Sequence, residues 1–442
     1  MPAAPLISYY GDDFTGSTDV MEALSAHGIE TVLFTRRPDA ELLARFADCR
    51  AIGLAGTSRS RSPEWMDENL PGAFAWLKSL SARFCHYKVC STFDSAPQRG
   101  SIGRAIEIGL RTFAQAQVPL IVGAPQLRRY TFLGQLFAGY RDEVHRIDRH
   151  PVMSCHPATP MLEADLLVHL AAQTGLSSRL DSPVDPVLSP KEGEDAHIVL
   201  IDVHDENSQR RAGAALTRRN PESGPLVFGS SGVEYALVEA WRAEGQDVGR
   251  RTFDPLTPCG RMAVVSGSCS PTTARQIETA CANGFRSIPV DHAALVTGQG
   301  REAACNTAVE EASRVLEAGL SPIIHTALGP PERMPGEGDP GGTGSDDAAG
   351  HALGAMLGEL MSRHRLGRIA IAGGDTSSHA LAALDIQALT LRHPIPDSPG
   401  SPVCLGHGTA PDAAPVELIL KGGQIGKDDY FPRLRDGRLT GD

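Results

Sequence analysis

The sequence of 442 residues lacks several patterns that would assign a protein class directly. No stretch approaches the ~20 uninterrupted apolar residues that span a bilayer. The start, MPAAPLISYYGDD, lacks the basic residues and long apolar run of a secretory signal. The nine cysteines are scattered without a C-x-x-C pair, which argues against a zinc ribbon or a redox motif. We therefore expect a cytoplasmic protein with reduced thiols and no membrane association.

An excess of positive charge is also missing. The net charge is −12, whereas nucleic acids and anionic membranes are bound by basic surfaces. Small anions stay possible ligands, because a local Lys/Arg cluster or a helix N-terminus binds them whatever the overall charge. The P-loop pattern G-x-x-x-x-G-K-[ST] and the serine-nucleophile pattern G-x-S-x-G do not occur. With 41% hydrophobic residues, the chain has enough apolar material for large cores.

Short apolar runs alternate with helical patterns along the chain, which predicts an α/β protein with mostly parallel sheets. Prolines and a glycine interrupt this alternation over residues 250–260, RRTFDPLTPCG. We therefore predict two α/β domains, residues 1–250 and 258–442. A segment rich in glycine and proline, residues 329–350, is expected to be a surface loop. Its formal G-x-G-x-x-G follows no strand and includes a proline, so it does not predict a dinucleotide site.

Two adjacent carboxylates follow the first expected strand in SYYGDDFTGSTD, residues 8–19. Asp12 and Asp13 would lie at the carboxyl end of that strand, where ligands bind in parallel α/β sheets. One carboxylate could accept a proton from a substrate hydroxyl while the other binds the substrate or orients the first. The structural alternative is that Asp13 or Thr15 only caps the next helix. Phosphatases with an aspartyl nucleophile are a third possibility, although they place their two acids one residue apart.

A second candidate site lies in HYKVCSTFDSAPQRGSIGRAIEIG, residues 86–109. Lys88 is on an expected strand that ends at Ser91, and Arg99 precedes a helix. A cation beside hydroxyls and a helix N-terminus suits a substrate that carries a carboxylate. The alternative is that Lys88 is an ordinary lysine of an edge strand.

A third candidate is the segment 129–161, which holds His145, His150 and His156 among arginines. Their spacing fits no zinc motif, because prolines interrupt any helix that would align them. We expect either a loop that carries an anion-binding arginine, Arg149, over a substrate cleft, or a plain surface loop.

Three segments in the second half have the form of a strand followed by a tight turn rich in glycine or serine. They are MAVVSGSCSPTTARQIE (262–278), IAIAGGDTSSHALAAL (369–384) and LILKGGQIGKDDYF (418–431). Backbone N–H groups in such turns and at helix N-termini bind phosphates, and Asp375 could hold Mg²⁺ directly or through water. The residues expected around a nucleotide are Ser266, Ser268, Gly373, Gly374, Asp375, Thr376, Gly423 and Gly426.

Five motifs, in this order along nearly the whole chain, resemble the four-carbon acid sugar kinase family, long known as a two-domain family of unknown function. They are GDDFTGSTD (11–19), YKVCST (87–92), SGSCSPTT (266–273), GGDTSS (373–378) and LKGGQIG (420–426). The resemblance implies that the N-terminal domain binds an acid sugar and the C-terminal domain binds ATP. It also implies that the γ-phosphate passes to a terminal hydroxyl across the interdomain cleft, with Mg²⁺ neutralising phosphoryl charge.

The resemblance assigns Asp12, Asp13, Thr15 and Lys88 to the substrate, and the proton-accepting base is either Asp13 or Asp12. Members that act on threonate or erythronate commonly continue the Ser-Thr of the second site with arginine and glycine, whereas Phe93 follows here. The acceptor thus stays open among threonate, erythronate, their 3-oxo forms and a branched acid such as 3-oxo-isoapionate. A non-catalytic sensor of sugar acid and nucleotide and an Asp-dependent phosphatase are the alternative functions, and a homodimer is possible.

Overall fold

The computed structural model describes residues 4–156, 158–182, 197–218, 224–298, 300–329, 343–410 and 414–439, without the side chains of 343–347 and Asp375. Most of the expected loop at 329–350, including its glycine motif, lies outside these residues. The chain divides into two compact units. The N-terminal unit is Met1–Val32 with Arg37–Arg251, and the C-terminal unit is Leu33–Arg36 with Thr252–Asp442.

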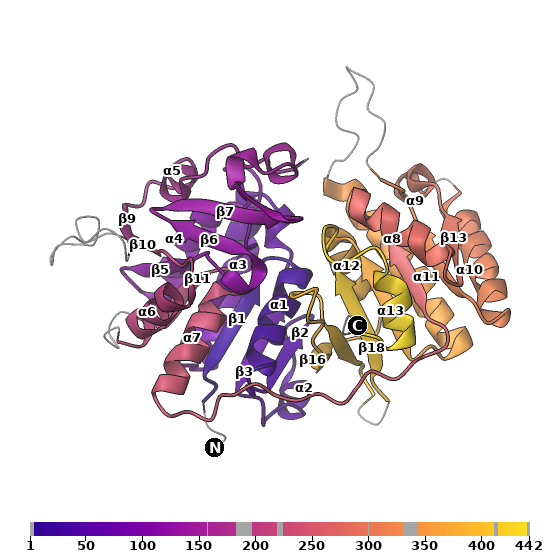
Figure 1. The fold of residues 1–442 in the computed structure, drawn as a ribbon, viewed down its shortest axis with the longest axis horizontal. Helices are drawn as coiled ribbons and strands as arrows, with labels where there is room; N and C mark the ends of the chain where they lie inside the picture. The colour runs from indigo at the N-terminus through magenta and orange to yellow at the C-terminus, as the bar shows by residue number, and fades with distance from the viewer. Residues whose placement is uncertain are drawn as a thin grey trace. The chain divides into compact units, whose positions relative to one another are not determined.

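The N-terminal unit is built on a parallel sheet in the strand order β3-β1-β4-β11-β5-β10-β9, with β2 beside β3 (Figure 1). Its central strands are buried along their whole length, as strands covered on both faces are. The strands are β1 (Ile7–Gly11), β2 (Thr31–Phe34), β3 (Ala51–Ala55), β4 (Phe84–Lys88), β5 (Val118–Ile121), β9 (Ser178–Asp181), β10 (Ile198–Ile201) and β11 (Leu226–Gly229).

Helices connect these strands. In α4, for example, Ile102, Ile106, Leu110 and Phe113 recur at helical spacing and are all buried, and the Ser101 side chain caps the first turn. The helices of this unit are α1 (Phe14–Ser25), α2 (Ala40–Ala44), α3 (Pro63–Ser79), α4 (Ile102–Phe113), α5 (Leu166–Ala171), α6 (Glu206–Thr217) and α7 (Gly232–Ala243). Single 3₁₀ turns are η1 (Ser58–Ser60), η2 (Pro125–Leu127), η3 (Ile147–Arg149) and η4 (Met153–Cys155).

The segment that follows β5 is more regular than the sequence suggested. Its first part forms a three-stranded antiparallel sheet, β6 (Arg129–Phe132), β7 (Gln135–Tyr140) and β8 (Glu143–Arg146). Leu133 and Gly134 both have positive φ and close the first hairpin in two residues. The expectation of a loop for this segment is therefore wrong for residues 129–146, whose short strands show little apolar alternation.

The sheet of the C-terminal unit has the order β13-β14-β12-β15-β18-β17-β16. Its first five strands are parallel, and β17 and β16 join antiparallel. Within this unit Leu33 and Phe34 pair antiparallel with Leu389 and Ala388 of β16. The strands are β12 (Ala263–Ser266), β13 (Phe285–Pro289), β14 (Ser321–His325), β15 (Arg368–Ala372), β16 (Ala388–His393), β17 (Val403–His407) and β18 (Val416–Lys421).

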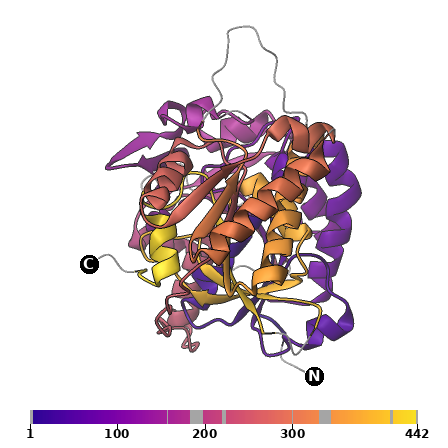
Figure 2. The ribbon, with the colours of Figure 1, turned by 90° about the vertical axis from the view of Figure 1, so that its right-hand side faces the viewer.

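Helices pack along both faces of this second sheet (Figure 2). Alternate strand residues, Val264, Ala370 and Ile419, share one core with side chains of α8 and α13. The helices α10, α11 and α12 contact the strands as well and contribute nothing to that core, so they cover the other face. The helices are α8 (Pro271–Cys281), α9 (His292–Thr297), α10 (Arg301–Glu317), α11 (Thr343–His364), α12 (Gly374–Ala382) and α13 (Tyr430–Asp436).

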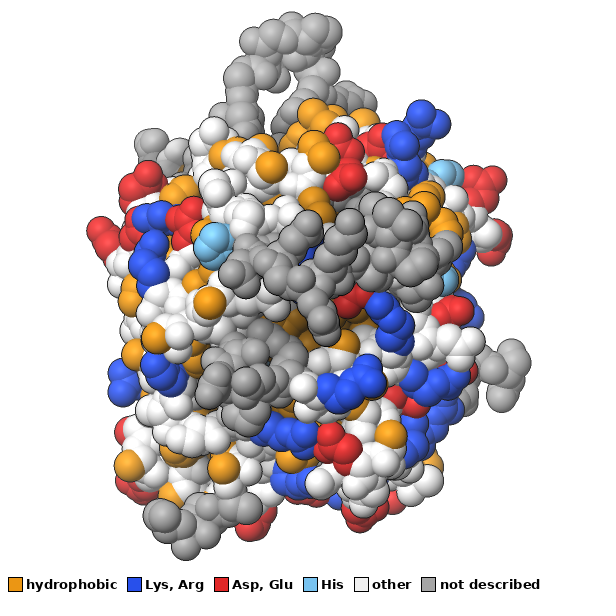
Figure 3. Space-filling view, turned by 90° about the vertical axis from the view of Figure 1, so that its left-hand side faces the viewer, with side chains coloured by type: hydrophobic (Ala, Val, Ile, Leu, Met, Phe, Trp, Pro, Cys, Tyr) orange, Lys and Arg blue, Asp and Glu red, His pale blue; other side chains and the backbone are white. Residues whose placement is uncertain are grey.

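The prediction of two α/β units with mostly parallel sheets is confirmed. Among the described residues, no helix combines the length and the apolar character needed to cross a membrane. Basic and acidic side chains lie interspersed over the face drawn in Figure 3, so on this face the net negative charge does not form one acidic patch.

Candidate active site

The carboxyl ends of β1, β3 and β4 lie next to each other, because Gly11 is in register with both Ala55 and Lys88. The chain segments that leave these strands are joined by backbone hydrogen bonds. The Asp12 N–H donates to the Lys88 carbonyl, and the Arg59 N–H donates to the Asp12 carbonyl, each at 3.0 Å. The loops after three strands therefore bring their polar side chains to one edge of the sheet. We call this group of residues the acidic edge: Asp12, Asp13, Thr15, Asp19, Arg59, Lys88 and Asp94.

Asp13 is held by partners on three sides. It is the N-cap of α1, and its Oδ1 accepts a hydrogen bond from the Gly16 N–H at 2.6 Å. Its Oδ2 accepts from the Thr15 hydroxyl at 2.8 Å and from Arg59 at 3.0 Å. The capping role weighed for Asp13 is thus what the structure shows, and Thr15 supports that cap. A carboxylate so engaged is an inefficient proton acceptor, because its lone pairs are already used.

Asp12 differs sharply from its neighbour. It is only 4% exposed, and its Oδ1 has no hydrogen-bond partner within the described part of the chain. Burial, reinforced by the negative charge of Asp13, raises the pKa of Asp12 to about 7. A carboxyl with an unpartnered oxygen and a pKa near neutrality is suited to exchange a proton at physiological pH. The geometry therefore favours Asp12 over Asp13 as the base.

Arg59, in η1 after β3, was not among the residues singled out from the sequence. Its guanidinium spans two carboxylates, Asp13 at 3.0 Å and Asp94 at 2.6 Å. Although burial alone would raise the pKa of Asp94, the neighbouring Arg59 together with His156 holds it below its usual value. The only signal in the sequence was an arginine directly after a strand whose end lies at the same sheet edge.

Lys88 lies inside the acidic edge and is 2% exposed. Its Nζ donates to the Val89 carbonyl at 2.9 Å and is 3.4 Å from a carboxylate oxygen of Asp19. Burial lowers the pKa of Lys88, but the surrounding acidic groups, Asp19 first among them, together outweigh it, so the pKa is raised. Gly16 covers the ammonium group, since a Cβ at this position would lie 3.1 Å from Nζ. The buried positive charge favours ionised carboxylates around it, Asp12 included.

The other residues expected on the substrate side are Ser91, Arg99 and Arg149, and among the described residues no side-chain hydrogen bond or ion pair joins them to this group. Ser91 is partly buried just after β4, and Arg99 is partly buried where the backbone of Ala96 and Arg99 forms an isolated bridge. Arg149 ends η3 and is exposed. Their roles in substrate binding stay predictions.

In the C-terminal unit, the turns after β12, β15 and β18 converge. A Cβ at Gly373 would lie 2.8 Å from the Thr376 hydroxyl and 3.4 Å from the Ser268 nitrogen. A Cβ at Gly423 would lie 3.1 Å from the Ser268 hydroxyl. Residues expected around a nucleotide from three separate motifs are therefore packed against one another. We call this group the glycine edge: Ser266, Ser268, Gly373, Gly374, Thr376, Lys421 and Gly423.

The glycine edge offers backbone N–H groups to an anion. Gly373 has a φ of +115°, a conformation that side-chain-bearing residues rarely adopt, and no side chain caps the helix α12 that follows. The N–H groups of its first turn are thus open to a phosphate. The Ser266 hydroxyl accepts from the Ser268 N–H at 3.3 Å, which shapes the turn after β12. Gly426, with a φ of +88°, lies against Tyr430 beyond the turn after β18.

Lys421, at the end of β18, is fully buried. Its Nζ donates to the Thr273 hydroxyl at 3.0 Å, to the Gly422 carbonyl at 2.9 Å and to the Gly423 carbonyl at 3.3 Å. All three donors of the ammonium group are therefore used inside the turn. Burial lowers the pKa of Lys421 to about 7. Lys421 is thereby a residue that shapes the turn containing Gly423.

The fit of Mg²⁺ was tested on the same residues. The part of the chain that the structure describes holds no group of three or more His, Cys, Asp or Glu arranged to bind a metal. Mg²⁺ in nucleotide sites needs only one or two carboxylates besides phosphates and waters, and the hydroxyls of Ser268 and Thr376 are oxygen ligands of the required kind. The Asp375 side chain, the expected ligand, lies outside the described residues.

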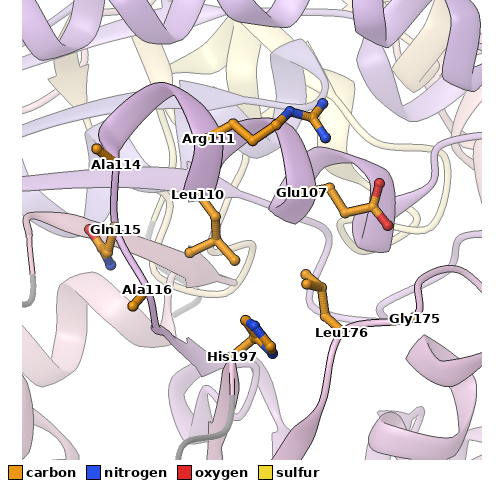
Figure 4. A pocket seen from close by; sticks show the side chains of 9 residues that line it. All are labelled: Glu107, Leu110, Arg111, Ala114, Gln115, Ala116, Gly175, Leu176 and His197. Carbon is orange, nitrogen blue, oxygen red and sulfur yellow. The ribbon is translucent and has the colours of Figure 1, made fainter.

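One open pocket, of about 610 Å³, lies elsewhere in the N-terminal unit (Figure 4). It is at the amino ends of β5, β9 and β10, whereas ligands of parallel sheets bind at the carboxyl ends. It therefore does not belong to the candidate site. The lining residues are Glu107, Leu110, Arg111, Ala114, Gln115, Ala116, Gly175, Leu176 and His197.

Known proteins resemble this chain in both halves. A model described as a sugar-binding N-terminal domain matches residues 7–237, and one described as a nucleotide-binding C-terminal domain matches residues 263–431. The protein named 3-oxo-isoapionate kinase of Paraburkholderia graminis is 42% identical over 461 residues, which cover 100% of this chain and 96% of that relative. The protein named 3-oxo-tetronate kinase of Pectobacterium atrosepticum is 27% identical over 434 residues, covering 96% of this chain and 97% of the relative.

Among solved structures, a Haemophilus influenzae protein superposes with a TM-score of 0.67 at 23% identity, covering 98% of this chain and 100% of the other, and supports the fold. The two domain matches lie on the two units that carry the acidic edge and the glycine edge. Together with the full-length relative at 42% identity, they confirm the family resemblance that the motifs indicated. The chain belongs to the four-carbon acid sugar kinase family.

Proposed function

We propose that this protein is an ATP-dependent kinase that phosphorylates a hydroxyl of a small sugar acid. The observation that carries the proposal is that one chain contains both kinds of group. Asp12 is a buried carboxylate with an oxygen that has no hydrogen-bond partner among the described residues, and a separate edge consists of glycines and hydroxyls. The first suits a group that accepts a hydroxyl proton, and the second suits a polyphosphate. Relatives that align over the full chain are named as sugar-acid kinases.

In this mechanism Asp12 receives the proton of the acceptor hydroxyl as the oxygen attacks the γ-phosphorus of ATP, and ADP leaves as the bond from the γ-phosphorus to the bridging oxygen breaks. Arg59 pairs with Asp13 and Asp94 and holds both in place, and Asp13 in turn fixes the first turn of α1. The N–H groups of the first turn of α12 and the turn held by Lys421 bind the phosphates. Mg²⁺ brought with ATP would neutralise phosphoryl charge, with Ser268, Thr376 and Asp375 as the residues to hold it.

The acceptor that we propose is a 3-oxo acid sugar, because the relative at 42% identity is named as a 3-oxo-isoapionate kinase and others as 3-oxo-tetronate kinases. The higher identity favours the branched acid, 3-oxo-isoapionate. Threonate and erythronate are the unoxidised comparisons. We further propose transfer across the interdomain cleft, a cytoplasmic location and a homodimer. Light scattering of the purified chain tests whether it is a homodimer.

The test is a coupled assay of ADP release with ATP, Mg²⁺ and a panel of acids: 3-oxo-isoapionate, 3-oxo-tetronate, threonate and erythronate. We expect ADP release with one oxo acid, at a rate that depends on its concentration. ATP binding without ADP release for any acid favours the sensor hypothesis. Release of phosphate from a phosphorylated acid without ATP favours the phosphatase. Failure to bind ATP excludes both the kinase and the sensor.

A further inference from the structure

Arg129, the first residue of β6, carries a positive charge that the N-terminal unit does not neutralise. In the described ranges, no carboxylate oxygen lies within ion-pair distance of its guanidinium. Its Nη1 donates only to carbonyl groups, those of Leu127 at 2.9 Å, Arg128 at 3.3 Å and Gly139 at 3.5 Å. Its Nε is enclosed and has no hydrogen-bond partner there. Carbonyl groups supply partial negative charge only, so this cation is incompletely compensated.

Other arginines of the unit show how unusual this is. Arg59 meets two carboxylates. Arg128, the immediate neighbour, donates to the carbonyls of Arg141 and Glu143 and closes a hairpin. Arg83 pairs with Glu244 at 2.7 Å on the surface. Arg129 combines a partly buried position with an unpartnered donor and no counter-charge. Arg179 also has unpartnered donors, but it lies on β9, the edge strand of the sheet, away from the strands that lead to the acidic edge.

The backbone holds Arg129 at the same sheet edge as the catalytic candidates. Its N–H donates to the Ala124 carbonyl at 3.1 Å and its carbonyl accepts from the Ala124 N–H at 2.9 Å, just after β5 ends. In the sheet order β1-β4-β11-β5, the strand β5 lies three positions from β1, the strand that leads to Asp12, which is about 14 Å at the usual strand spacing. The Cys90 thiol and the Asp19 carboxylate of this edge are close enough to act on its charge.

These observations point to an anion that the protein itself does not supply. A carboxylate is the counter-charge that a guanidinium binds best, through two parallel hydrogen bonds. We propose that Arg129 binds the carboxylate of the sugar acid and thereby selects acids over neutral sugars. The substrate then lies along the sheet edge, with its acid group at Arg129 and its reactive hydroxyl toward Asp12.

This inference rests on the proposed function, since it names the residue that recognises the acid. The sequence suggested the site around Lys88 and Arg99 for a carboxylate-bearing substrate, and Arg149, in the segment of Arg129, as an anion-binding arginine. Arg149 is exposed, and an exposed arginine is screened by water and salt. The partly buried Arg129 acts where the dielectric constant is lower, so its attraction for a carboxylate is stronger.

The experiment compares wild type, Arg129→Gln, Arg129→Lys and a matched Arg83→Gln control in the full-length protein. Arg83 precedes β4, at the other end of that strand from Lys88. For Arg129→Gln we expect KM for the acid to rise about 10- to 100-fold, as for loss of a hydrogen bond to a charged group. KM for ATP should not change. Arg129→Lys should recover part of the affinity, because it restores charge without the fork of donors.

A second readout separates recognition from a structural role. The neutral alcohol that replaces the carboxylate of the same substrate is measured as a competitive inhibitor. Its inhibition constant should be the same in wild type and Arg129→Gln, whereas the acid loses affinity. An unchanged KM for the acid, equal losses for acid and alcohol, or a larger effect from Arg149→Gln would each overturn the proposal.

Failure of the proposed function gives a different result. If wild type releases no ADP with any acid, the kinase proposal fails, and binding of threonate and 3-oxo-isoapionate is then measured by calorimetry. Arg129→Gln should still lose that binding while Arg83→Gln keeps it. If Arg129→Gln does not fold, Arg129→Lys carries the test, and an affinity for the acid equal to that of wild type then counts against the proposal.

Discussion

The acidic edge and the glycine edge of this protein consist of different chemical groups. The acidic edge consists of charged side chains, in which Arg59 and Lys88 are enclosed among carboxylates. The glycine edge consists of backbone, hydroxyls and a single buried lysine, with Gly373 at a φ of +115°. Both lie at the carboxyl ends of parallel strands, so topology alone does not distinguish them.

The difference follows from what each edge has to do. Exchange of a proton requires a side chain whose pKa lies near the working pH, and burial among charges raises the pKa of Asp12 to about 7. Binding a polyphosphate requires many donors that carry no counter-ion and need no proton, which open N–H groups provide. Changes to charge should therefore affect the acidic edge, and changes to backbone freedom should affect the glycine edge.

The largest effect is expected from Asp12→Asn. Loss of the base should lower kcat about 10²- to 10⁴-fold with an unchanged affinity for ATP, measured by ADP release and by calorimetry. Asp13→Asn is the matched control, because asparagine is an equally good N-cap, and it should lose less activity. If Asp13→Asn loses more than Asp12→Asn, the assignment of the base is reversed.

On the other edge, Gly373→Ala should weaken ATP binding at least about tenfold and leave the affinity for the acid unchanged. An alanine at this φ costs about 1–3 kcal/mol, and its Cβ would lie 2.8 Å from the Thr376 hydroxyl. Gly367→Ala, at the other end of β15, is the control, because a Cβ there meets nothing within 4 Å. Equal ATP affinities for the two variants would contradict a nucleotide site at Gly373.

Arg59→Gln should change the pH profile. Wild-type kcat/KM is expected to fall about tenfold per pH unit below about 7, where Asp12 becomes protonated. The positive charge of Arg59 lowers the pKa of Asp12, so its removal should move this acid limb to higher pH. A profile that keeps its midpoint while all rates fall would indicate that Arg59 acts through structure alone.

The smallest effect concerns stability. The folded-state pKa of Asp12 lies above its ordinary value, so the folded protein binds more protons than the unfolded chain between about pH 4 and 7, and stability falls as pH rises through that range. Asp12→Asn should therefore raise the free energy of unfolding at pH 8 by about 1–4 kcal/mol and by little at pH 4.5. Urea unfolding at both values measures this, and an equal change at both would exclude the buried charge as its cause.

Much of the fold could be predicted from the sequence, because short apolar strands and amphipathic helices alternate clearly. The helical spacing of Ile102, Ile106 and Leu110 corresponds to the buried face of α4. The antiparallel sheet β6–β8 was not predicted, since its strands are half exposed and rich in charge. Their pairing depends on two-residue turns at positive φ. A leucine such as Leu133 gives no indication of such a turn in the sequence.

The candidate site was predictable in part. Motifs at strand ends located both edges, since the carboxyl ends of parallel strands share one side of a sheet. Partners from distant loops were not predictable. Arg59 comes from a loop without any motif, and the cap that engages Asp13 and leaves Asp12 open became visible only from hydrogen bonds. For the same reason, the sequence did not distinguish Arg129 from the other arginines of its segment.

The sequence by itself determined the local structure: which stretches form strands, which turns contain glycine, and which order the motifs take. These depend on side-chain periodicity and backbone freedom, which are properties of neighbouring residues. Only the tertiary structure decided which of two adjacent aspartates is open and which arginine lacks a counter-charge. Burial and the partners of a charge are set by residues far away in the chain, and they determine pKa and ligand affinity.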